Sequence, residues 1–391
     1  MRADEKKEYL AVVPSLFDIY VGNFENKPVL RDAADASPHL HVVAGVFVYN
    51  PKIRKFLVQQ RAASKMTYPN HFTDSASGHI KARHGMSLAT IKEEMCRELA
   101  EEMGVKAGPD QLKLWTFFQD PEVNEIKFDF VGKVEQEEIH PDLSEVTGRS
   151  GWVDAATLRA MLRSERFVGP VVNLWEVLLD NEARFDMFLK GLDGWQSYWK
   201  WCDGLRAFKE WYCSTASTSR SRQRPRSIPM FLGRFQPFHR GHLKCLQHIE
   251  KQAQDVIVAI GSAQYSRDER NPLAYDERRD VIQHVIEREK LGFRNVFFVP
   301  IPDIHNERLW MQNIKFLFSD AIELNSNNDW VRGLAKGAGI RLGKKLAFEV
   351  GTLNGSNTRE LMRAGGEWQA LVPDPRYMEE RGLVEIIKAS K

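Results

Sequence analysis

The sequence of 391 residues has no apolar run that approaches the length of a membrane span. A spanning helix needs about 18 or more consecutive apolar residues. The first segment, MRADEKKEYL, is charged and lacks the apolar core of a secretory signal. We therefore expect no membrane partner and a cytoplasmic location.

Cysteine is scarce, and neither sign of charge is in excess. The four cysteines show neither CxxC nor zinc-site spacing, which predicts free thiols in a reducing compartment; they are Cys96, Cys202, Cys213 and Cys245. The 55 Lys and Arg residues nearly balance the 53 Asp and Glu residues, for a formal net charge of +2. This balance neither requires nor excludes an acidic polymer, and we do not expect nucleic acid as a partner.

What the sequence does contain is the composition of an ordinary globular protein. Hydrophobic residues make up 43% and charged residues 28%, and the length predicts two or three domains, because a single core rarely grows so large. The clearest break is the Ser- and Arg-rich stretch 214–227, STASTSRSRQRPRS, which we interpret as an exposed linker. Its four arginines leave nucleic-acid contact or nuclear import as alternatives to a plain solvated tether.

Before the linker, the patterns predict a domain of strands and helices. Short strands at 41–49 and 55–60 flank a turn, and a helix is expected over 87–103, ending at Gly104. The apolar residues of this helix recur at helical spacing: Leu88, Ile91, Met95 and Leu99. We place an N-terminal extension at 1–37, a domain at 38–155, and a helical segment at 156–213 that packs on this domain.

The segment 156–213 is rich in aromatic residues, including Trp195, Trp199, Trp201 and Trp211. Aromatic sets of this kind form core or interdomain packing more often than ligand sites. We expect packing here, with ligand binding as the alternative.

After the linker, in a domain at 228–391, strands alternate with helices. Strands are expected at 229–233, 255–260 and 295–300, with helices from about His242 and over 278–290. Such alternation predicts an α/β fold with a parallel sheet, and ligands outside the carboxyl ends of the strands.

The first of these strands ends directly in Gly233-Arg-Phe-Gln-Pro-Phe-His-Arg-Gly-His242. Two histidines, His239 and His242, stand where a helix begins, and a helix N-terminus attracts phosphate through its unpaired N–H groups. Gly241 between them lets the backbone approach a triphosphate closely. The pattern suits nucleotidyl transfer, which needs charge neutralisation and positioning more than a covalent nucleophile. The alternative is that the two histidines merely cap the helix.

Four further blocks follow in order over 229–373, and together they resemble the archaeal-type nicotinamide mononucleotide adenylyltransferases of the nucleotidyltransferase superfamily. The segment that opens at Gly233 looks like the ATP signature of that family. The other matching blocks are Gly261-Ser-Ala-Gln264 with Arg270-Asn-Pro-Leu and Glu277-Arg278; Pro302-Asp-Ile304 with Asn306 and Trp310; Asn328-Asp-Trp-Val331; and Gly355-Ser-Asn-Thr-Arg359 with Trp368 and Pro373. The resemblance implies a Rossmann-like nucleotidyltransferase domain.

The resemblance also implies a role for each site residue. Arg234, Arg270 and Arg359 would converge on the triphosphate, where guanidinium forks suit phosphate oxygens. Trp310 would stack on the pyridinium ring, and Asn306 would read the carboxamide. The remaining residues implied to bind substrate are Gly233, Phe235, Gly241, Gly261, Ser262, Gln264, Asn328 and Ser356. Sibling enzymes that transfer nucleotides to other phosphates share HxGH, so Asn306 and Trp310 favour nicotinamide mononucleotide as the acceptor.

The helix near residue 100 carries a second set of chemistry-bearing residues. Glu98, Glu101 and Glu102 stand at i, i+3 and i+4, so three carboxylates share one face. Oxygen-only clusters of this kind suit Mg²⁺ or Mn²⁺. The alternative is an ordinary solvated acidic face.

The order Arg97-Glu-Leu-Ala-Glu-Glu-Met-Gly-Val105, preceded by Gly78, resembles the Nudix box of diphosphate hydrolases. The resemblance covers about 38–155 and implies an α/β/α sandwich with a mixed sheet, a metal held by the three glutamates, and Glu125 as the base. Flanking residues look like the isopentenyl-diphosphate isomerase branch, but the cysteine that isomerisation needs near Ser75 to Ser77 is absent. An insertion of about three residues separates Arg97 from Gly78, and the early Glu of the box has no counterpart.

Together the two resemblances imply a bifunctional enzyme of NAD metabolism. One domain would make NAD and pyrophosphate from ATP, a substrate, and nicotinamide mononucleotide. The other would use Mg²⁺ or Mn²⁺ to hydrolyse ADP-ribose or a related dinucleotide. Two alternatives stand beside this: the first domain is a non-catalytic module that binds nucleotides or a partner, or the transferase uses another phosphate acceptor. We expect small nucleotides as partners and leave homo-oligomerisation open.

Overall fold

The computed structural model describes residues 9–30, 33, 40–82, 85–218, 227–318, 321–346 and 353–390. Contacts within the chain separate it into two compact units. The first comprises Met1–Leu189 with Ile304–Leu309, and the second comprises Lys190–Asp303 with Trp310–Lys391. Each unit has its own sheet and its own core.

The first unit is built on an eight-stranded mixed sheet. Its strands are β1 (Tyr9–Val13), β2 (Lys27–Leu30), β3 (Leu40–Asn50), β4 (Lys55–Val58), β5 (Ala76–His79), β6 (Leu112–Asp120), β7 (Glu125–Lys133) and β8 (Gly151–Val153). The order β2-β1-β3-β4-β8 forms the main path; β5 and β7 also pair with β3, and β6 pairs with β7. Only the β3–β7 pair is parallel among the described strands of this sheet. The predicted mixed sheet is confirmed.

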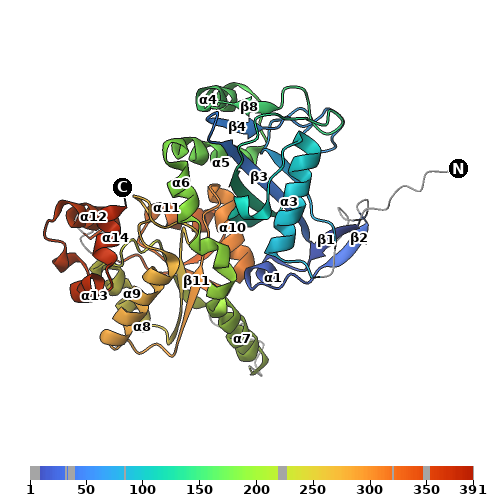
Figure 1. Ribbon diagram of the computed structural model, residues 1–391. Coiled ribbons are helices and arrows are strands. Elements are labelled where there is room, and N and C mark those ends of the chain that lie inside the picture. The colour runs from blue at the N-terminus through green and yellow to red at the C-terminus, as the bar shows by residue number, and fades with distance from the viewer. Residues whose placement is uncertain are drawn as a thin grey trace. The chain divides into compact units, whose positions relative to one another are not determined.

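Helices cover both faces of β3, whose every residue is buried. Alternate strand residues face opposite sides of a sheet, and α3 (Leu88–Met103) and α5 (Gly169–Asp180) lie on opposite sides of β3 (Figure 1). On the α5 side, the buried Trp175 packs edge-on against Phe47 of β3, with ring centroids 4.8 Å apart. The predicted α/β/α sandwich is therefore present. The unit also contains α1 (Leu16–Tyr20), η1 (Pro109–Gln111), α4 (Ala155–Ser164) and η2 (Glu182–Arg184), while α6 (Phe185–Gly191) runs across its boundary.

The described part of the predicted extension, 1–37, differs from the prediction. Residues 9–30 form β1, α1 and β2, and β1 joins the sheet through Val12, which lies opposite His41 of β3. The apolar residues from Leu10 to Val13 are buried, which gives this strand its place. Residues 1–8, 31–32 and 34–37 of the extension lie outside the described residues.

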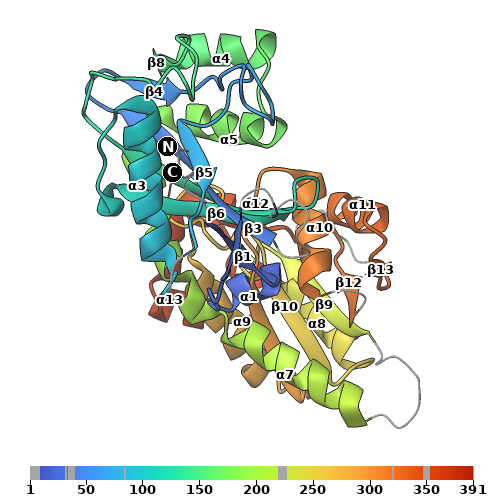
Figure 2. The ribbon, with the colours of Figure 1, turned by 90° about the vertical axis from the view of Figure 1, so that its right-hand side faces the viewer.

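The second unit contains a five-stranded sheet with the order β11-β10-β9-β12-β13, and all of its pairs are parallel. The strands are β9 (Ile228–Gly233), β10 (Asp255–Ile260), β11 (Asn295–Pro300), β12 (Ile322–Asn325) and β13 (Arg341–Leu342). Figure 2 shows β9 and β10 side by side. The order reverses between β9 and β12, and in such sheets this switch point carries the ligand site at the carboxyl ends of the strands.

Helices connect the parallel strands of the second unit. They are α8 (Arg240–Glu250), α9 (Tyr275–Arg288), α10 (Glu307–Phe318) and α11 (Asp329–Gly337), followed by α12 (Gly355–Ala364), η5 (Gln369–Leu371), α13 (Pro375–Glu380) and α14 (Leu383–Ala389). In Figure 1, α8 and α9 lie together on one side of this sheet. The predicted parallel sheet and its first three strands are confirmed, and α8 begins two residues before the predicted start at His242.

The predicted segment 156–213 does not pack as a single body on the first domain. Its later part, η3 (Gly194–Trp201) and α7 (Asp203–Thr218), belongs to the second unit. There Trp201 stacks on Tyr275, with ring centroids 4.9 Å apart. A Cβ on Gly204 would lie 2.0 Å from the carbonyl oxygen of Phe298, so α7 lies directly against β11. The expected packing role of the aromatic residues holds, since Trp195 is fully buried.

The predicted linker, 214–227, starts too early. Helix α7 continues to Thr218, and within it the hydroxyl of Ser214 donates to the carbonyl of Trp211 at 2.8 Å. Residues 219–226 lie outside the described residues. All four cysteines are free thiols, as expected. Within the described ranges, no helix is long and apolar enough to cross a membrane.

Candidate active sites

The first candidate site lies at the carboxyl ends of β9 and β10 in the second unit. After Gly233, the chain turns through Phe235, which has a positive φ of 53°, and enters α8 with His239 at the N-cap. The backbone N–H of His239 donates to Nδ1 of His242 over 3.2 Å, and the two rings stack with centroids 3.6 Å apart. Gly241, between them, is buried in the first turn of α8.

The hydrogen bond to His242 fixes what this ring offers a ligand. Because Nδ1 accepts, the neutral ring carries its proton on Nε2, which is a donor. Burial lowers the pKa of His239 to about 4, and burial followed by the neighbouring His239 places the pKa of His242 well below its ordinary value. Both rings are therefore neutral near pH 7. The Nδ1 atom of His239 is buried and has no hydrogen-bond partner within the described chain.

Arg359 reaches the same loop from α12. Its Nη1 donates to the carbonyl of Gln236 over 2.6 Å and its Nη2 to the hydroxyl of Ser356 over 3.3 Å. Burial and then the nearby Arg234 lower the pKa of Arg359 to about 10, so the side chain stays charged near neutral pH. Its buried Nε has no partner among the described residues. Two cations this close, with an unpaired donor, suit a polyanionic ligand.

The structure does not bring every predicted phosphate ligand to this point. Arg270 lies exposed in the loop after β10, where its backbone N–H donates to Asp268 over 2.7 Å. Gln264 is buried, and its amide exchanges two hydrogen bonds with the backbone of Asp303, at 2.6 and 2.9 Å. Phe235 is buried against Gly233 and the ring of His242. These residues shape the loops, and any contact with substrate remains a prediction.

Residues expected on the acceptor side show mixed placement. Trp310 donates from Nε1 to the carbonyl of Pro302 over 3.0 Å, and its ring lies nearly parallel to that of Trp330 at 5.9 Å. Trp330 is 50% exposed; it lies in the block Asn328-Asp-Trp-Val331, but no role was assigned to it from the sequence. Asn306 and Asn328 both use their side-chain oxygens to accept backbone N–H groups at the starts of α10 and α11.

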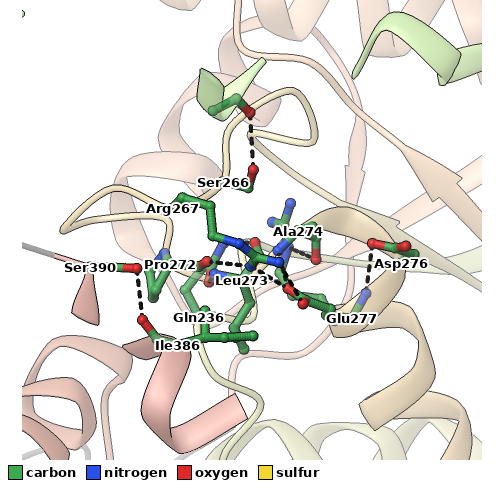
Figure 3. Close-up of polar contacts among 12 residues, drawn as sticks. Gln236, Ser266, Arg267, Pro272, Leu273, Ala274, Asp276, Glu277, Ile386 and Ser390 are labelled. Atoms are coloured by element: carbon green, nitrogen blue, oxygen red, sulfur yellow. Dashed lines mark hydrogen bonds and ion pairs between the residues drawn. The ribbon is translucent and has the colours of Figure 1, made fainter. Parts of the chain in front are cut away.

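The loop after β10 is closed on itself (Figure 3). Arg267 donates to both carboxylate oxygens of Glu277, at 2.7 and 2.8 Å, and to the carbonyl of Pro272 at 3.0 Å. Gln236, from the first loop, bonds to both the N–H and the carbonyl of Leu273. Gly261 and Ser262 begin this loop, and Ser262 has a positive φ of 48°. The two loops are thereby joined.

The second candidate site lies in the first unit, where α3 packs over β5. Ser87 caps the start of α3 and Gly104, with a positive φ of 68°, ends it, as predicted. Glu98 packs directly over Gly78, where a Cβ would lie 2.7 Å from its carboxyl carbon. Glu102 is buried and accepts from Nε2 of Gln59 at 3.1 Å and from the N–H of Ser77 at 3.2 Å.

Glu98 and Glu102 both have raised pKa values. Burial raises the pKa of Glu98, and burial followed by the neighbouring Glu98 raises the pKa of Glu102 to about 8. The buried carboxylate of Glu102 and the half-buried carboxylate of Glu98 repel each other, and such a pair of oxygen ligands fits a hard divalent cation. Among the described residues, no group of three or more His, Cys, Asp or Glu side chains is gathered closely enough to hold a metal ion.

The other two predicted residues, Glu101 and Glu125, are not gathered with Glu98 and Glu102 into one cluster. Glu101 has a side chain 60% exposed and pairs with Arg97, which also contacts Glu94 and Glu98. Glu125, at the start of β7, lies 3.6 Å from Nε2 of His79. Since His79 follows Gly78 in one strand, the two face opposite sides of β5, and Glu125 and Glu98 approach this strand from opposite faces. The sequence patterns also missed Gln59, which only the fold brings to Glu102.

Comparisons with known proteins find a family match in each half of the chain. The model of the Cytidylyltransferase-like family matches residues 230–332, and the NUDIX domain model matches residues 39–170. The nicotinamide-nucleotide adenylyltransferase of Pyrococcus abyssi is 32% identical over 163 residues, which cover 41% of this chain and 83% of that protein. The enzyme of the same name from Thermoplasma acidophilum is 36% identical over 152 residues, covering 37% and 79%.

Among solved structures, the bifunctional NMN adenylyltransferase/ADP ribose pyrophosphatase of Francisella tularensis is 19% identical, with a TM-score of 0.37; the match covers 42% of this chain and 52% of that one. The match covers 83% and 79% of the two sequence relatives. The chain carries a NUDIX domain and belongs to the nicotinamide-nucleotide adenylyltransferase family.

Proposed function

We propose that the second unit transfers the adenylyl group of ATP to nicotinamide mononucleotide, which gives NAD and pyrophosphate. The observation that carries this proposal is the neutral pair His239 and His242 at the start of α8, beside the buried, partly unpaired guanidinium of Arg359. A helix N-terminus with such donors is built for phosphate.

The residues support transfer without a covalent intermediate. A phosphate oxygen of nicotinamide mononucleotide would attack the α-phosphorus of ATP, and the bond to the β-phosphate oxygen would break, so that pyrophosphate leaves. The Nε2–H of His242 would donate to a phosphate oxygen in the transition state. Arg234 and Arg359 would neutralise charge on the triphosphate. Arg270, exposed in its loop, is proposed to reach the triphosphate once ATP is bound.

The acceptor is proposed from the aromatic pair in the same unit. Trp310 and Trp330 lie nearly parallel, and Trp330 is half exposed. A pyridinium ring carries a positive charge, which an aromatic face attracts. The curated relatives named above carry the same acceptor in their names. Asn306 is proposed to bind the carboxamide with its amide NH₂, since its oxygen already accepts from Leu309.

The acceptor assignment is tested by supplying the full chain with ATP, Mg²⁺ and a panel of phosphate monoesters. The panel contains nicotinamide mononucleotide, nicotinate mononucleotide, phosphocholine and glycerol 3-phosphate. We expect the highest kcat/KM with nicotinamide mononucleotide, and a higher KM for it in Trp330→Ala. Better transfer to a monoester without a pyridine ring would remove the assignment.

For the first unit we propose metal-dependent hydrolysis of a nucleoside diphosphate derivative, with ADP-ribose as the first candidate. The carrying observation is the half-buried Glu98 beside the buried Glu102, in a segment that matches the NUDIX model. A bound Mg²⁺ or Mn²⁺ would polarise the diphosphate and activate water. Gln59 and Ser77 would hold the carboxylate of Glu102 in place for the metal.

The hydrolase proposal is tested with ADP-ribose and Mn²⁺ on the full chain. Glu102→Gln should abolish the release of AMP, because it removes the buried ligand. Glu101→Gln should reduce it less, because Glu101 is exposed and bound to Arg97. A wild-type chain that binds ADP-ribose without cleaving it would favour the alternative, a nucleotide-binding module without catalysis.

A further inference from the structure

Arg278 is the most deeply buried cation described in the second unit, and the function proposed above does not use it. It is the fourth residue of α9, and its side chain is fully buried. Burial lowers the pKa of Arg278 to about 9, so it remains charged near neutral pH. A buried charge requires close partners.

The partners of Arg278 are backbone carbonyls from three separate segments. Nη1 donates to Arg234 at 2.9 Å and to Gly261 at 2.8 Å. Nη2 donates to Ser262 at 3.3 Å, and Nε donates to Ala274 at 3.2 Å. One guanidinium therefore joins the loop after β9, the loop after β10 and the start of α9.

Two of these carbonyls stand immediately before strained turns. Arg234 precedes Phe235, with φ at 53°, and Gly261 precedes Ser262, with φ at 48°. Left-handed backbone is unfavourable for residues that have a Cβ, and it persists only where surrounding contacts impose it. The hydrogen bonds from Arg278 to the carbonyls of both loops are contacts of that kind.

The outer side of the second loop has a separate restraint. Arg267 and Glu277 form a bidentate pair across it, and the amide of Gln236 bonds to Leu273 (Figure 3). These contacts close the loop but do not reach the carbonyls of Arg234 and Gly261. The buried guanidinium is therefore a further link between the two phosphate loops, beside the Gln236–Leu273 bonds and the bond from the N–H of Gly261 to the carbonyl of Gly233 at 2.9 Å.

We propose that Arg278 is a positioning residue for ATP, which holds the loops after β9 and β10 in the register that aligns Arg234 and the His239–His242 pair on the triphosphate. The proposal rests on the adenylyl transfer proposed above. Arg278 itself touches no phosphate. A lysine in its place keeps the charge but lacks the planar fork that reaches several carbonyls at once.

The test compares Arg278→Lys and Arg278→Ala with Arg279→Lys and Arg279→Ala as matched controls. Arg279 is the next residue of the same helix, is partly exposed and pairs with Asp280. For each full-length variant we would measure the dissociation constant of MgATP by titration calorimetry, the KM for each substrate, and the recovery of activity by added guanidinium ion.

We expect Arg278→Lys to bind MgATP about tenfold or more weakly, with the KM for nicotinamide mononucleotide unchanged. Guanidinium, but not methylammonium, should restore part of the activity of Arg278→Ala, and the Arg279 variants should match the wild type. If Arg278→Ala does not fold, the lysine variant decides alone.

Wild-type MgATP affinity in Arg278→Lys would overturn the proposal, as would an equal rise in both KM values. ATP affinity is measured without an acceptor. If the wild-type chain forms no dinucleotide, the proposed transfer is wrong. The ATP titration still decides the role of Arg278 in that case.

Discussion

Single protonation states set the chemistry of both sites. In the second unit, burial keeps His239 and His242 neutral, so that they act as hydrogen-bond donors and not as fixed cations. In the first unit, burial keeps Glu102 protonated near pH 7 in the absence of a metal. In the proposed functions, neutral donors would meet a polyanion in one site, and a metal would displace a proton in the other.

Glu102 makes the stability of the first unit depend on pH. Its folded pKa, about 8, lies above the ordinary value of 4.5. A raised pKa contributes stability that is complete below pH 4.5 and is lost as the pH rises through 8. The loss can reach about 1.4 kcal/mol for each pH unit in that window. We expect the metal-free melting temperature to fall from pH 5 to pH 8.5, and Glu102→Gln to flatten the slope.

Metal binding reverses this dependence, because the cation takes the place of the proton. The stabilisation by Mn²⁺ should therefore grow from pH 6 to pH 8.5 in the wild type and be absent in Glu102→Gln. Thermal scans across pH, with and without Mn²⁺, measure both effects. An unchanged pH slope in Glu102→Gln would show that another group is responsible.

At the residue scale, the sequence predicts those site residues that stand in a recognisable motif. His239, His242, Arg234 and Arg359 are recognisable from their spacing and come together. Arg278 belongs to a block recognised in the sequence, but its contacts are not predictable, because the carbonyls that it binds are brought close only by the fold. Gln59 is not predictable for the same reason, since only the fold brings it to Glu102. Glu101 shares a helical face with Glu98 by spacing, yet Arg97 draws it toward solvent.

At the scale of elements, α3 positions the acidic residues through its two ends. Its C-cap, Gly104, has a left-handed φ of 68°, and an added Cβ would lie 2.7 Å from the backbone nitrogen of His140. Glu102 lies in the last turn, so any displacement of this cap moves a proposed metal ligand. The helix end thus links local backbone geometry to the candidate site.

Gly104→Ala should destabilise the first unit by more than the about 1 to 2 kcal/mol that left-handed backbone alone costs an alanine. Gly85→Ala is the matched control, because Gly85 has a φ of 74° and no atom within 4 Å of an added Cβ. Chemical denaturation of the two variants gives the comparison. Equal losses of stability would mean that the contact with His140 contributes nothing.

Elements with strong periodicity and clear caps, such as α3 and the strands β9, β10 and β11, were predictable from the sequence. The strand β1 was not, because its short apolar run joins the sheet only through pairing with the later strands β2 and β3. The boundary between the two units, which falls within 156–213, was not predictable either, because a helix with an aromatic face can pack on either of the two adjoining domains. The contacts of α7 with β11 assign it to the second unit, among them the close approach of Gly204 to Phe298 and the packing of Phe208 against Phe297.

For the whole molecule, each candidate site draws its central residues from one unit. His239, His242 and Arg359 belong to the second, whereas Glu98 and Glu102 belong to the first. The two proposed reactions therefore have no residue in common at their centres.

We expect the two activities to be separable by single substitutions. Glu102→Gln should leave NAD synthesis at the wild-type rate, and His242→Ala should leave ADP-ribose hydrolysis unchanged. Both rates would be measured on the same preparation of each variant. A loss of both activities in either folded variant would contradict this independence.

The central claim is adenylyl transfer by the second unit, and the most direct test follows the α-phosphate of ATP. The full chain would receive ATP labelled on the α-phosphorus, nicotinamide mononucleotide and Mg²⁺. The label should appear in NAD with one pyrophosphate released for each dinucleotide, and His242→Ala should slow this by about 100-fold or more. Label recovered only as AMP, or transfer unaffected by the substitution, would contradict the claim.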